Sequence, residues 1–220
     1  MKKNDFSAAF KRLEALLDSG ERRLLRGLTN PAKIQGFLDQ TAYSSDAFYR
    51  CPLRVLRERR AHCFDGAVFG AAALGRIGHP PLIVDMYPDG RDDEHLLAVF
   101  KVDGRWGAVA KSNFVGLRYR EPVYRGLREL VMSYFEPYYN TEREKTLRAY
   151  TRPLNLNTFR ALDWLTEDGP LERIARRTDE LKRIALITRK MAARLLPVDE
   201  RSYQAGLFGS DPAGLYRPQP

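Results

Sequence analysis

Cys63 and His95, in the middle of the sequence, are of the two residue types that together perform nucleophilic catalysis. Cys63 is expected at the start of a helix, where the positive end of the helix dipole and free backbone N–H groups favour a thiolate. His95 follows Asp92, Asp93 and Glu94, whose charges favour a protonated imidazole. A thiolate–imidazolium pair is the activated state of a cysteine nucleophile.

Each of these residues also has a purely structural interpretation. Cys63 alone reads as a small buried core residue, and His95 alone as a hydrogen-bonded residue at the end of a strand. Their order, a cysteine opening a helix and a histidine opening a strand, favours the catalytic interpretation. A metal site made of His62, Cys63 and His95 is disfavoured because it lacks the usual ligand spacing, so neither a metal nor a cofactor is expected.

The elements around these residues predict an α+β core. The small and apolar residues of 62–78 indicate a buried helix, and 81–87 is a β-branched strand. Residues 95–102 and 105–114 are two further strands, joined by a two-residue turn at Asp103-Gly104. The order helix, strand, strand, strand indicates a helix-start cysteine packed on a small antiparallel sheet, not a doubly wound sheet.

Helical segments are expected on both sides of this core. Helices are predicted over 5–28, from Asn30-Pro31 onwards, and over 121–137, 157–166 and 170–196. The Gly- and Pro-rich end predicts an irregular tail. The expected organisation is an N-terminal helical segment over 1–60, the core over 61–137, a C-terminal helical segment over 138–200 and the tail over 201–220.

The stretch from His62 to Tyr87 resembles the transglutaminase-like branch of the papain-like cysteine peptidase superfamily. In that branch the nucleophilic cysteine opens a helix, often as C-x-D-x-A, and a G-x-P segment leads into the next strand. The matching positions here are Cys63, Asp65, Ala67 and Gly78-His79-Pro80. The family's histidine begins a strand that is followed by a turn and a tryptophan, as do His95, Asp103-Gly104 and Trp106. The resemblance covers about residues 61–113 and implies chemistry on an amide or peptide bond.

The sequence departs from the family where an aspartate usually orients the histidine. The family's W-x-x-V-D string is here Trp106-Gly107-Ala108-Val109-Ala110. Hairpin pairing predicts Ser112 opposite His95, Asn113 is an amide alternative, and a turn near Asp89-Gly90-Arg91 brings Asp85 beside His95 from the other side. These three candidates, and the absence of any orienting side chain, remain open. The backbone N–H of Cys63 is the natural first donor to an oxyanion.

Composition limits the other functions. The 220 residues carry 37 basic and 28 acidic side chains, a net charge of +9. Residues 61–110 hold four basic and seven acidic residues, so the excess lies on the flanks, where a solvated surface is a better explanation than a nucleic-acid site. No window is apolar enough for a membrane span, and Asp5, Lys11 and Arg12 interrupt any secretion signal, so a cytoplasmic location is expected.

The main hypothesis is a thiol-dependent hydrolase or acyltransferase. Cys63 would form a thioester with an amide or peptide substrate, and His95 would act as general base and acid. A catalytically degenerate binding or scaffolding module of the same fold is the alternative, motivated by the missing aspartate. A basic nucleic-acid-binding protein is a lesser alternative. The expected partner is a peptide, protein or small amide substrate, and nothing in the sequence indicates an oligomeric state.

Overall fold

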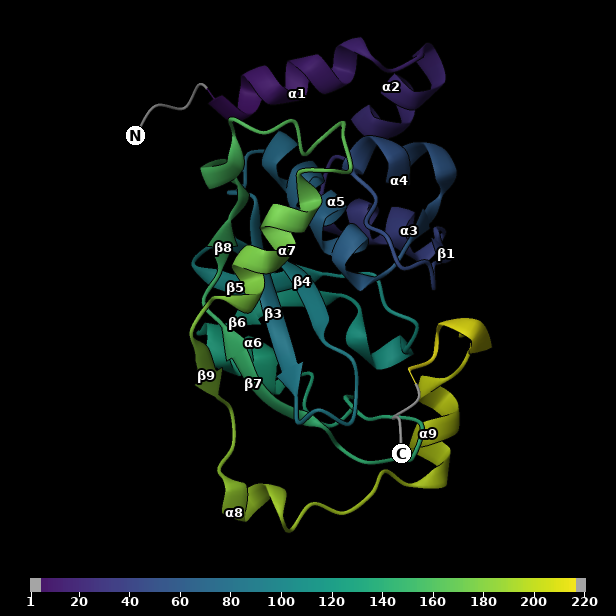
Figure 1. The fold of residues 1–220 in the computed structure, drawn as a ribbon, viewed down its shortest axis with the longest axis vertical. Helices are drawn as coiled ribbons and strands as arrows, with labels where there is room; N and C mark the ends of the chain where they lie inside the picture. The colour runs from purple at the N-terminus through teal and green to yellow at the C-terminus, as the bar shows by residue number, and fades with distance from the viewer. Residues whose placement is uncertain (1–4, 217–220) are drawn as a thin grey trace.

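A computed structural model describes residues 5–216 of the chain, and its α+β fold confirms the predicted class. The helices alternate irregularly with strands along the chain (Figure 1). The α-helices are α1 (Asp5–Ala15), α2 (Ser19–Gly27), α3 (Pro31–Asp39), α4 (Pro52–Glu58), α5 (Cys63–Arg76), α6 (Leu127–Met132), α7 (Leu171–Asp179), α8 (Arg189–Ala192) and α9 (Glu200–Gly206). Three short 3-10 helices are η1 (Val115–Leu117), η2 (Leu156–Phe159) and η3 (Pro212–Gly214).

The central sheet has seven strands, and every pairing within it is antiparallel. Its strands are β3 (Leu82–Pro88), β4 (His95–Val102), β5 (Arg105–Val109), β6 (Arg120–Tyr124), β7 (Leu147–Thr151), β8 (Leu154–Asn155) and β9 (Arg183–Ala185). Two further strands, β1 (Ala42–Tyr43) and β2 (Arg60–Ala61), form a separate parallel pair. The strands of the central sheet lie in the order β6-β5-β4-β3-β7-β9, and β8 also pairs with β3.

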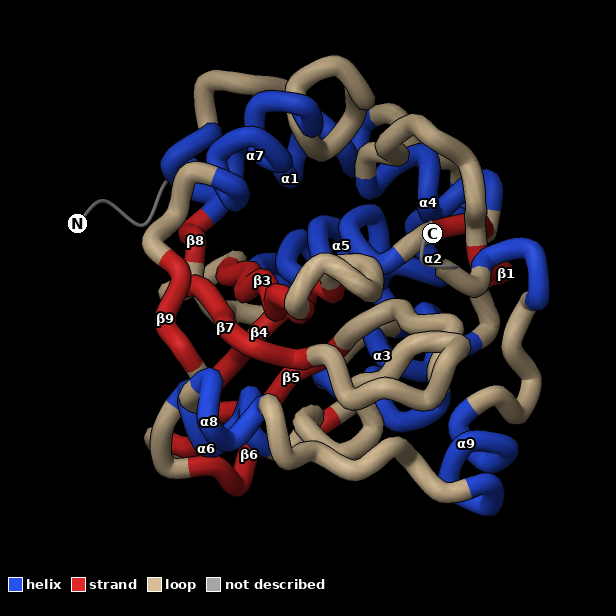
Figure 2. Tube along the Cα trace, turned by 60° about the horizontal axis from the view of Figure 1, so that its bottom comes forward, coloured by secondary structure: helices blue, strands red, loops and turns tan. Residues whose placement is uncertain are grey.

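Helix α5 is the central buried helix and packs on one face of the sheet (Figure 2). Its small residues allow this close approach: a Cβ added at Gly70 would lie 2.9 Å from Val109 Cγ2 and 3.1 Å from Ala98 Cβ. The opposite face carries a second core, in which Leu130 and Val131 of α6 pack with Leu97 of β4. Alternate residues of a strand therefore enter different cores, which decides where the residues near Cys63 lie.

The hairpin between β4 and β5 has the predicted turn and register. Asp103 and Gly104 both have positive φ, 48° and 77°, as a two-residue hairpin of this type requires. Pairing begins at Val102 and Arg105 and continues to Ala98 and Val109, as predicted. The paired part of the third strand ends at Val109, earlier than the predicted residue 114.

The helix predicted over 121–137 is wrong in its first half. Residues 120–124 form β6, an edge strand, and α6 begins only at Leu127. Pro122 explains the difference, because proline disrupts a helix interior but is tolerated on an edge strand.

The prediction of one long helix over 170–196 is also wrong. The chain forms α7, then β9, which extends the sheet by pairing with β7, and then the short α8. Residues 157–166 contain part of η2 and turns in place of an α-helix. Segment 138–200 therefore supplies three strands to the sheet and is not a helical segment. The predicted domain boundaries themselves remain a prediction.

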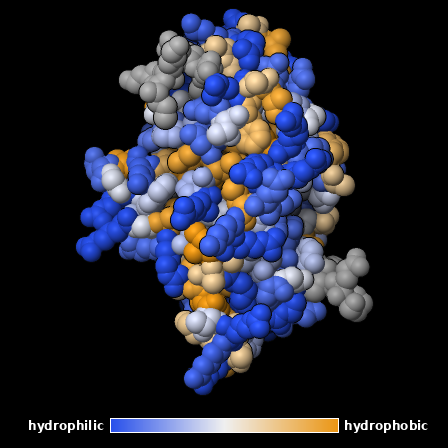
Figure 3. Space-filling model, turned by 60° about the vertical axis from the view of Figure 1, so that its left-hand side comes forward, coloured by the Kyte–Doolittle hydropathy of each residue, from blue (hydrophilic) through white to orange (hydrophobic). Residues whose placement is uncertain are grey.

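The expected irregular tail over 201–220 contains most of α9 and all of η3, and its last four residues lie outside the described part of the chain. The hydroxyl of Tyr139 donates to the Ser202 carbonyl oxygen at 3.0 Å, which attaches α9 to the body of the molecule. The face in Figure 3 is mostly hydrophilic, with apolar residues in a narrow, broken band. Within residues 5–216, every helix is too short or too polar to span a bilayer.

Candidate functional site around Cys63

Cys63 is the first residue of α5, as predicted, and a reciprocal capping arrangement fixes the start of this helix. His62 is the N-cap: its Nδ1 accepts from the Asp65 N–H at 3.4 Å, and Asp65 Oδ2 accepts from the His62 N–H at 3.3 Å. Asp65 Oδ1 also accepts from the Arg50 N–H at 2.8 Å. The aspartate two residues after the cysteine therefore has a local structural function: it holds the helix start that carries the thiol.

The Cys63 thiol is half-buried and protonated in this environment. Its Sγ donates to the Glu94 carbonyl oxygen at 3.6 Å. Burial, followed by the charge of Asp93, raises the pKa of the Cys63 thiol well above its ordinary value. Burial therefore opposes the thiolate that the helix start was predicted to favour, and that prediction remains a prediction.

His95 opens β4, as predicted, and its ring is oriented by a backbone carbonyl. The side chain is 4% exposed, and Nε2 lies 2.8 Å from the Leu117 carbonyl oxygen. A carbonyl oxygen only accepts hydrogen bonds, so Nε2 carries the proton and the lone pair of the neutral ring lies on Nδ1. Burial lowers the pKa of His95 to about 4. The prediction that the preceding acidic residues hold His95 protonated is therefore wrong, because burial dominates.

A cavity of about 50 Å³ is lined by four of the five predicted site residues: Cys63, His95, Ser112 and Asn113. Within residues 5–216, no hydrogen bond joins the Cys63 thiol to the His95 ring. Ser112 Oγ accepts from the Phe114 N–H at 3.0 Å. The Asn113 amide exchanges two hydrogen bonds with the Asp211 backbone, at 2.7 and 2.8 Å.

The orienting group is therefore the Leu117 carbonyl, which sequence reasoning missed. Neither Ser112 nor Asn113 hydrogen-bonds to His95, because pairing of β4 with β5 ends at Ala98 and Val109 and each of the two side chains is bonded elsewhere. A backbone acceptor leaves no residue-type signal, since every residue has one. Identifying the Leu117 carbonyl as the acceptor requires the position of η1, the short 3-10 helix that carries Leu117.

Asp85 lies one position away from where the turn argument put it. Met86 is opposite His95 in the β3–β4 pairing, and Asp85 is opposite Leu96. Since side chains alternate between the faces of a sheet, Asp85 is on the α5 face and His95 on the other. Asp85 is 1% exposed, and neither of its carboxylate oxygens accepts a geometrically regular hydrogen bond within the described residues.

Asp85 instead lines a larger cavity, of about 430 Å³, that also borders on Cys63. Tyr43 lines both cavities, and Tyr49 and His62 line only the larger one. Cys63 is thus at the boundary of two cavities, one on the side of His95 and one on the side of Asp85. The Cys63 side chain can therefore be approached from two cavities.

No protein-family model matches the chain, and no curated protein is similar to it. A comparison with solved structures finds weak similarity to three structures of LapG from Legionella pneumophila. One is 11% identical, covers 79% of this chain and 97% of that one, and has a TM-score of 0.42. A calcium-bound form is 13% identical over 78% and 98% of the two chains (TM-score 0.41), and an EGTA-treated form is 15% identical over 49% and 69% (TM-score 0.35). Similarity of this size assigns neither a family nor an activity.

Proposed function

We propose that the protein is a thiol-dependent hydrolase or acyltransferase that acts on an amide or peptide bond through Cys63. The resemblance to the transglutaminase-like branch of the papain-like cysteine peptidases supports this reaction class. The site geometry adds independent support, since a helix-start thiol and an oriented neutral imidazole line one cavity.

The proposed reaction begins with the neutral forms of both groups. His95 Nδ1 takes the thiol proton as Cys63 Sγ bonds to the amide carbonyl carbon. The resulting oxyanion accepts a hydrogen bond from the Cys63 N–H, which has no intrahelical partner at the first position of a helix. The C–N bond then breaks, and the amine leaves with the proton from His95. Water or an amine next attacks the thioester, giving an acid or a new amide and restoring the thiol.

The observation that carries this proposal is the hydrogen bond from His95 Nε2 to the Leu117 carbonyl. A catalytic imidazole needs a fixed tautomer, and the family's aspartate, which would fix it, is absent here. The carbonyl supplies the same orientation without a charge. An uncharged acceptor stabilises an imidazolium less than a carboxylate does, so a modest rate is expected, with His95 charged only transiently.

Incubation with a defined mixture of synthetic peptides, followed by mass spectrometry of the products, tests the proposal. The wild type and Cys51→Ala should hydrolyse or transfer the same bonds, and Cys63→Ala should leave every peptide intact. Cys51 is the matched control, because it is 2% exposed and lines neither cavity. Turnover by Cys63→Ala would contradict the proposal.

The second candidate, a catalytically degenerate binding module, is favoured by one observation. The Cys63 thiol is hydrogen-bonded to the Glu94 carbonyl, and burial raises its pKa, so the resting sulfur is not a nucleophile. In a binding module, a bound peptide would leave the Cys63 thiol protonated and unreactive. A wild type that binds peptides but leaves them all intact, as Cys63→Ala does, would favour this candidate.

A further inference from the structure

The larger cavity beside Cys63 has a strongly acidic wall. Its lining includes six carboxylates and, among the described residues, no lysine or arginine. The six are Asp46, Asp85, Asp93, Glu94, Glu172 and Asp179. This contrasts with the chain as a whole, whose net charge is +9. An acidic cavity in a basic protein requires a specific explanation.

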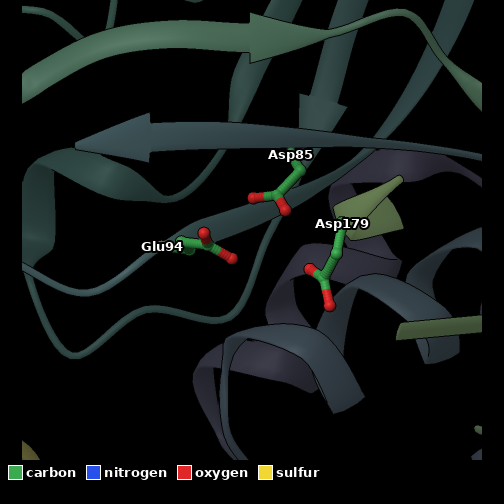
Figure 4. Close-up of side chains that lie close together, drawn as sticks. All are labelled: Asp85, Glu94 and Asp179. Carbon is green, nitrogen blue, oxygen red and sulfur yellow. The ribbon is translucent and has the colours of Figure 1, made fainter. Parts of the chain in front are cut away.

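Three of these carboxylates converge on one point. Asp85, Glu94 and Asp179 each place a carboxylate oxygen within 4.8 Å of the other two. Figure 4 shows their side chains directed toward a common space, although they come from β3, the residue before β4, and the end of α7. Like charges at this separation repel one another unless a cation or a proton lies between them.

Asp85 is the member that most needs a partner. It is 1% exposed, and within residues 5–216 both oxygens lack a regular hydrogen-bond donor. The Tyr87 hydroxyl is close enough to lower the pKa of Asp85 somewhat, but it donates to the Thr178 carbonyl at 3.3 Å. Burial outweighs this effect and raises the pKa of Asp85. Burying a carboxylate without a hydrogen-bond donor costs free energy unless a bound ligand supplies the donor.

Arg183, the basic side chain whose charge acts on Asp85, does not hydrogen-bond to it. Arg183 stacks on the Tyr87 ring, with its guanidinium carbon 3.8 Å from the ring centre, and one nitrogen is 3.8 Å from Glu94 Oε1. That separation is too long for a hydrogen bond, and Arg183 is more than half exposed. The charge of Arg183 lowers the pKa of Asp85, but burial outweighs this effect, and within the described residues no hydrogen bond joins the two side chains.

We propose that this cavity is a subsite for a cationic group of the substrate, an ammonium or guanidinium that donates to Asp85, Glu94 and Asp179. The inference rests on the proposed function only in naming the molecule bound as the substrate of Cys63. The cavity volume of about 430 Å³ is in the range of small-molecule sites and far exceeds the volume of a single ion. The rings of Tyr43 and Tyr49 offer apolar contact for an alkyl stem.

Binding of two probes that differ only by the ammonium at the end of the side chain tests this inference on the Cys63→Ala protein without requiring any chemistry. The probes are Nα-acetyl-lysine amide and Nα-acetyl-norleucine amide, and calorimetry or ligand-observed NMR gives both Kd values. The lysine probe should bind roughly tenfold more tightly or better, since charge-assisted hydrogen bonds supply the difference. A failed reaction with a preserved lysine preference would remove the proposed function but keep the subsite.

Isosteric variants localise the effect. In the Cys63→Ala background, Asp85→Asn and Glu94→Gln should each reduce the lysine preference at least about threefold, because charge-assisted hydrogen bonds are stronger than neutral ones. Glu172→Gln is the matched control, because Glu172 lines the same cavity but is outside the cluster of three, and it should keep the preference. Equal binding of both probes would overturn the inference, as would an unchanged preference in both cluster variants. So would Asp85-dependent binding of Ca²⁺ or Mg²⁺ that excludes the lysine probe.

Discussion

His95 Nε2 lies 2.8 Å from the carbonyl oxygen of Leu117, so the orientation of this imidazole depends on the main chain of a short 3-10 helix. The side chain at position 117 takes no part in that hydrogen bond. The proposed base is therefore sensitive to the path of the backbone between β5 and β6, and the Leu117 side chain, which is buried in the second core, acts on it only through that path.

The reactivity of Cys63 should depend steeply on pH. Burial raises the pKa of its thiol, and only the thiolate is alkylated, so the iodoacetamide rate should rise about tenfold per pH unit between pH 7 and 9. Cys51, 2% exposed, should react more slowly throughout. Tryptic mapping with mass spectrometry separates the two sites. A Cys63 rate that is already at its plateau at pH 7 would show a preformed thiolate and contradict this assignment.

His95 should make folding stability depend on pH. Its folded-state pKa of about 4 is below the ordinary value of 6.5, so the unfolded state binds the proton first as the pH falls. This contribution is fully present above pH 7 and is lost between about pH 6.5 and 4, up to about 3 kcal/mol. Urea unfolding of the wild type and His95→Gln should give a stability difference that shrinks over this interval. Parallel curves would contradict the assignment.

Asp85→Asn should stabilise the protein at alkaline pH. Burial raises the folded-state pKa of Asp85, so the unfolded carboxyl ionises at lower pH and the folded state loses stability as the pH rises above about 4. The amide avoids this loss. The gain in Tm should therefore be larger at pH 8 than at pH 5, while the exposed Glu167→Gln changes neither value. A lower Tm for Asp85→Asn at pH 8 would mean that the carboxylate has an internal partner.

Gly66→Ala should destabilise the start of α5. An added Cβ would lie 2.2 Å from Lys111 Cβ, and Lys111 is a buried residue whose Nζ donates to the Leu38 carbonyl at 3.1 Å. Overpacking of this kind costs about 1–3 kcal/mol, which exceeds the gain of up to about 1 kcal/mol from replacing glycine in a helix. Urea unfolding measures the difference.

The control for that substitution is Gly36→Ala in α3. Nothing lies within 4 Å of a Cβ added there, so only the helix-propensity gain remains. Gly36→Ala should raise the free energy of unfolding and Gly66→Ala should lower it. Equal effects at the two glycines would show that Lys111 can move away from the added Cβ with little loss of free energy of unfolding.

Local signals explain the part of the fold that could be predicted. Asp103-Gly104 specifies its turn through two positive φ angles, and Asn30 followed by Pro31 specifies a helix start. Both features could therefore be predicted from a few neighbouring residues. The strand around Ile184 could not be predicted from neighbouring residues in this way. Its strand forms because β7 offers a free edge to pair with, and that edge is created by the fold as a whole.

In the candidate site, too, local residues predicted some features and only the complete fold determines the others. Cys63 and His95 were identified by residue type and order, and their protonation states were not, because desolvation depends on all the chain that surrounds them. The misplacement of Asp85 came from a single residue of register. A shift of one residue along a strand moves a side chain to the opposite face of the sheet. Asp85 therefore lines a different cavity from the one that His95 lines.

Acylation of Cys63 by p-nitrophenyl acetate tests the central claim most directly, since it measures thioester formation without a known substrate. Stopped-flow release of p-nitrophenolate gives the rate, and tryptic mapping locates the acetyl group. The account predicts a thioester at Cys63 that forms roughly 100-fold more slowly in His95→Gln and at an unchanged rate in Cys51→Ala. An equal rate in His95→Gln, or an acetyl group on any other residue, would contradict it.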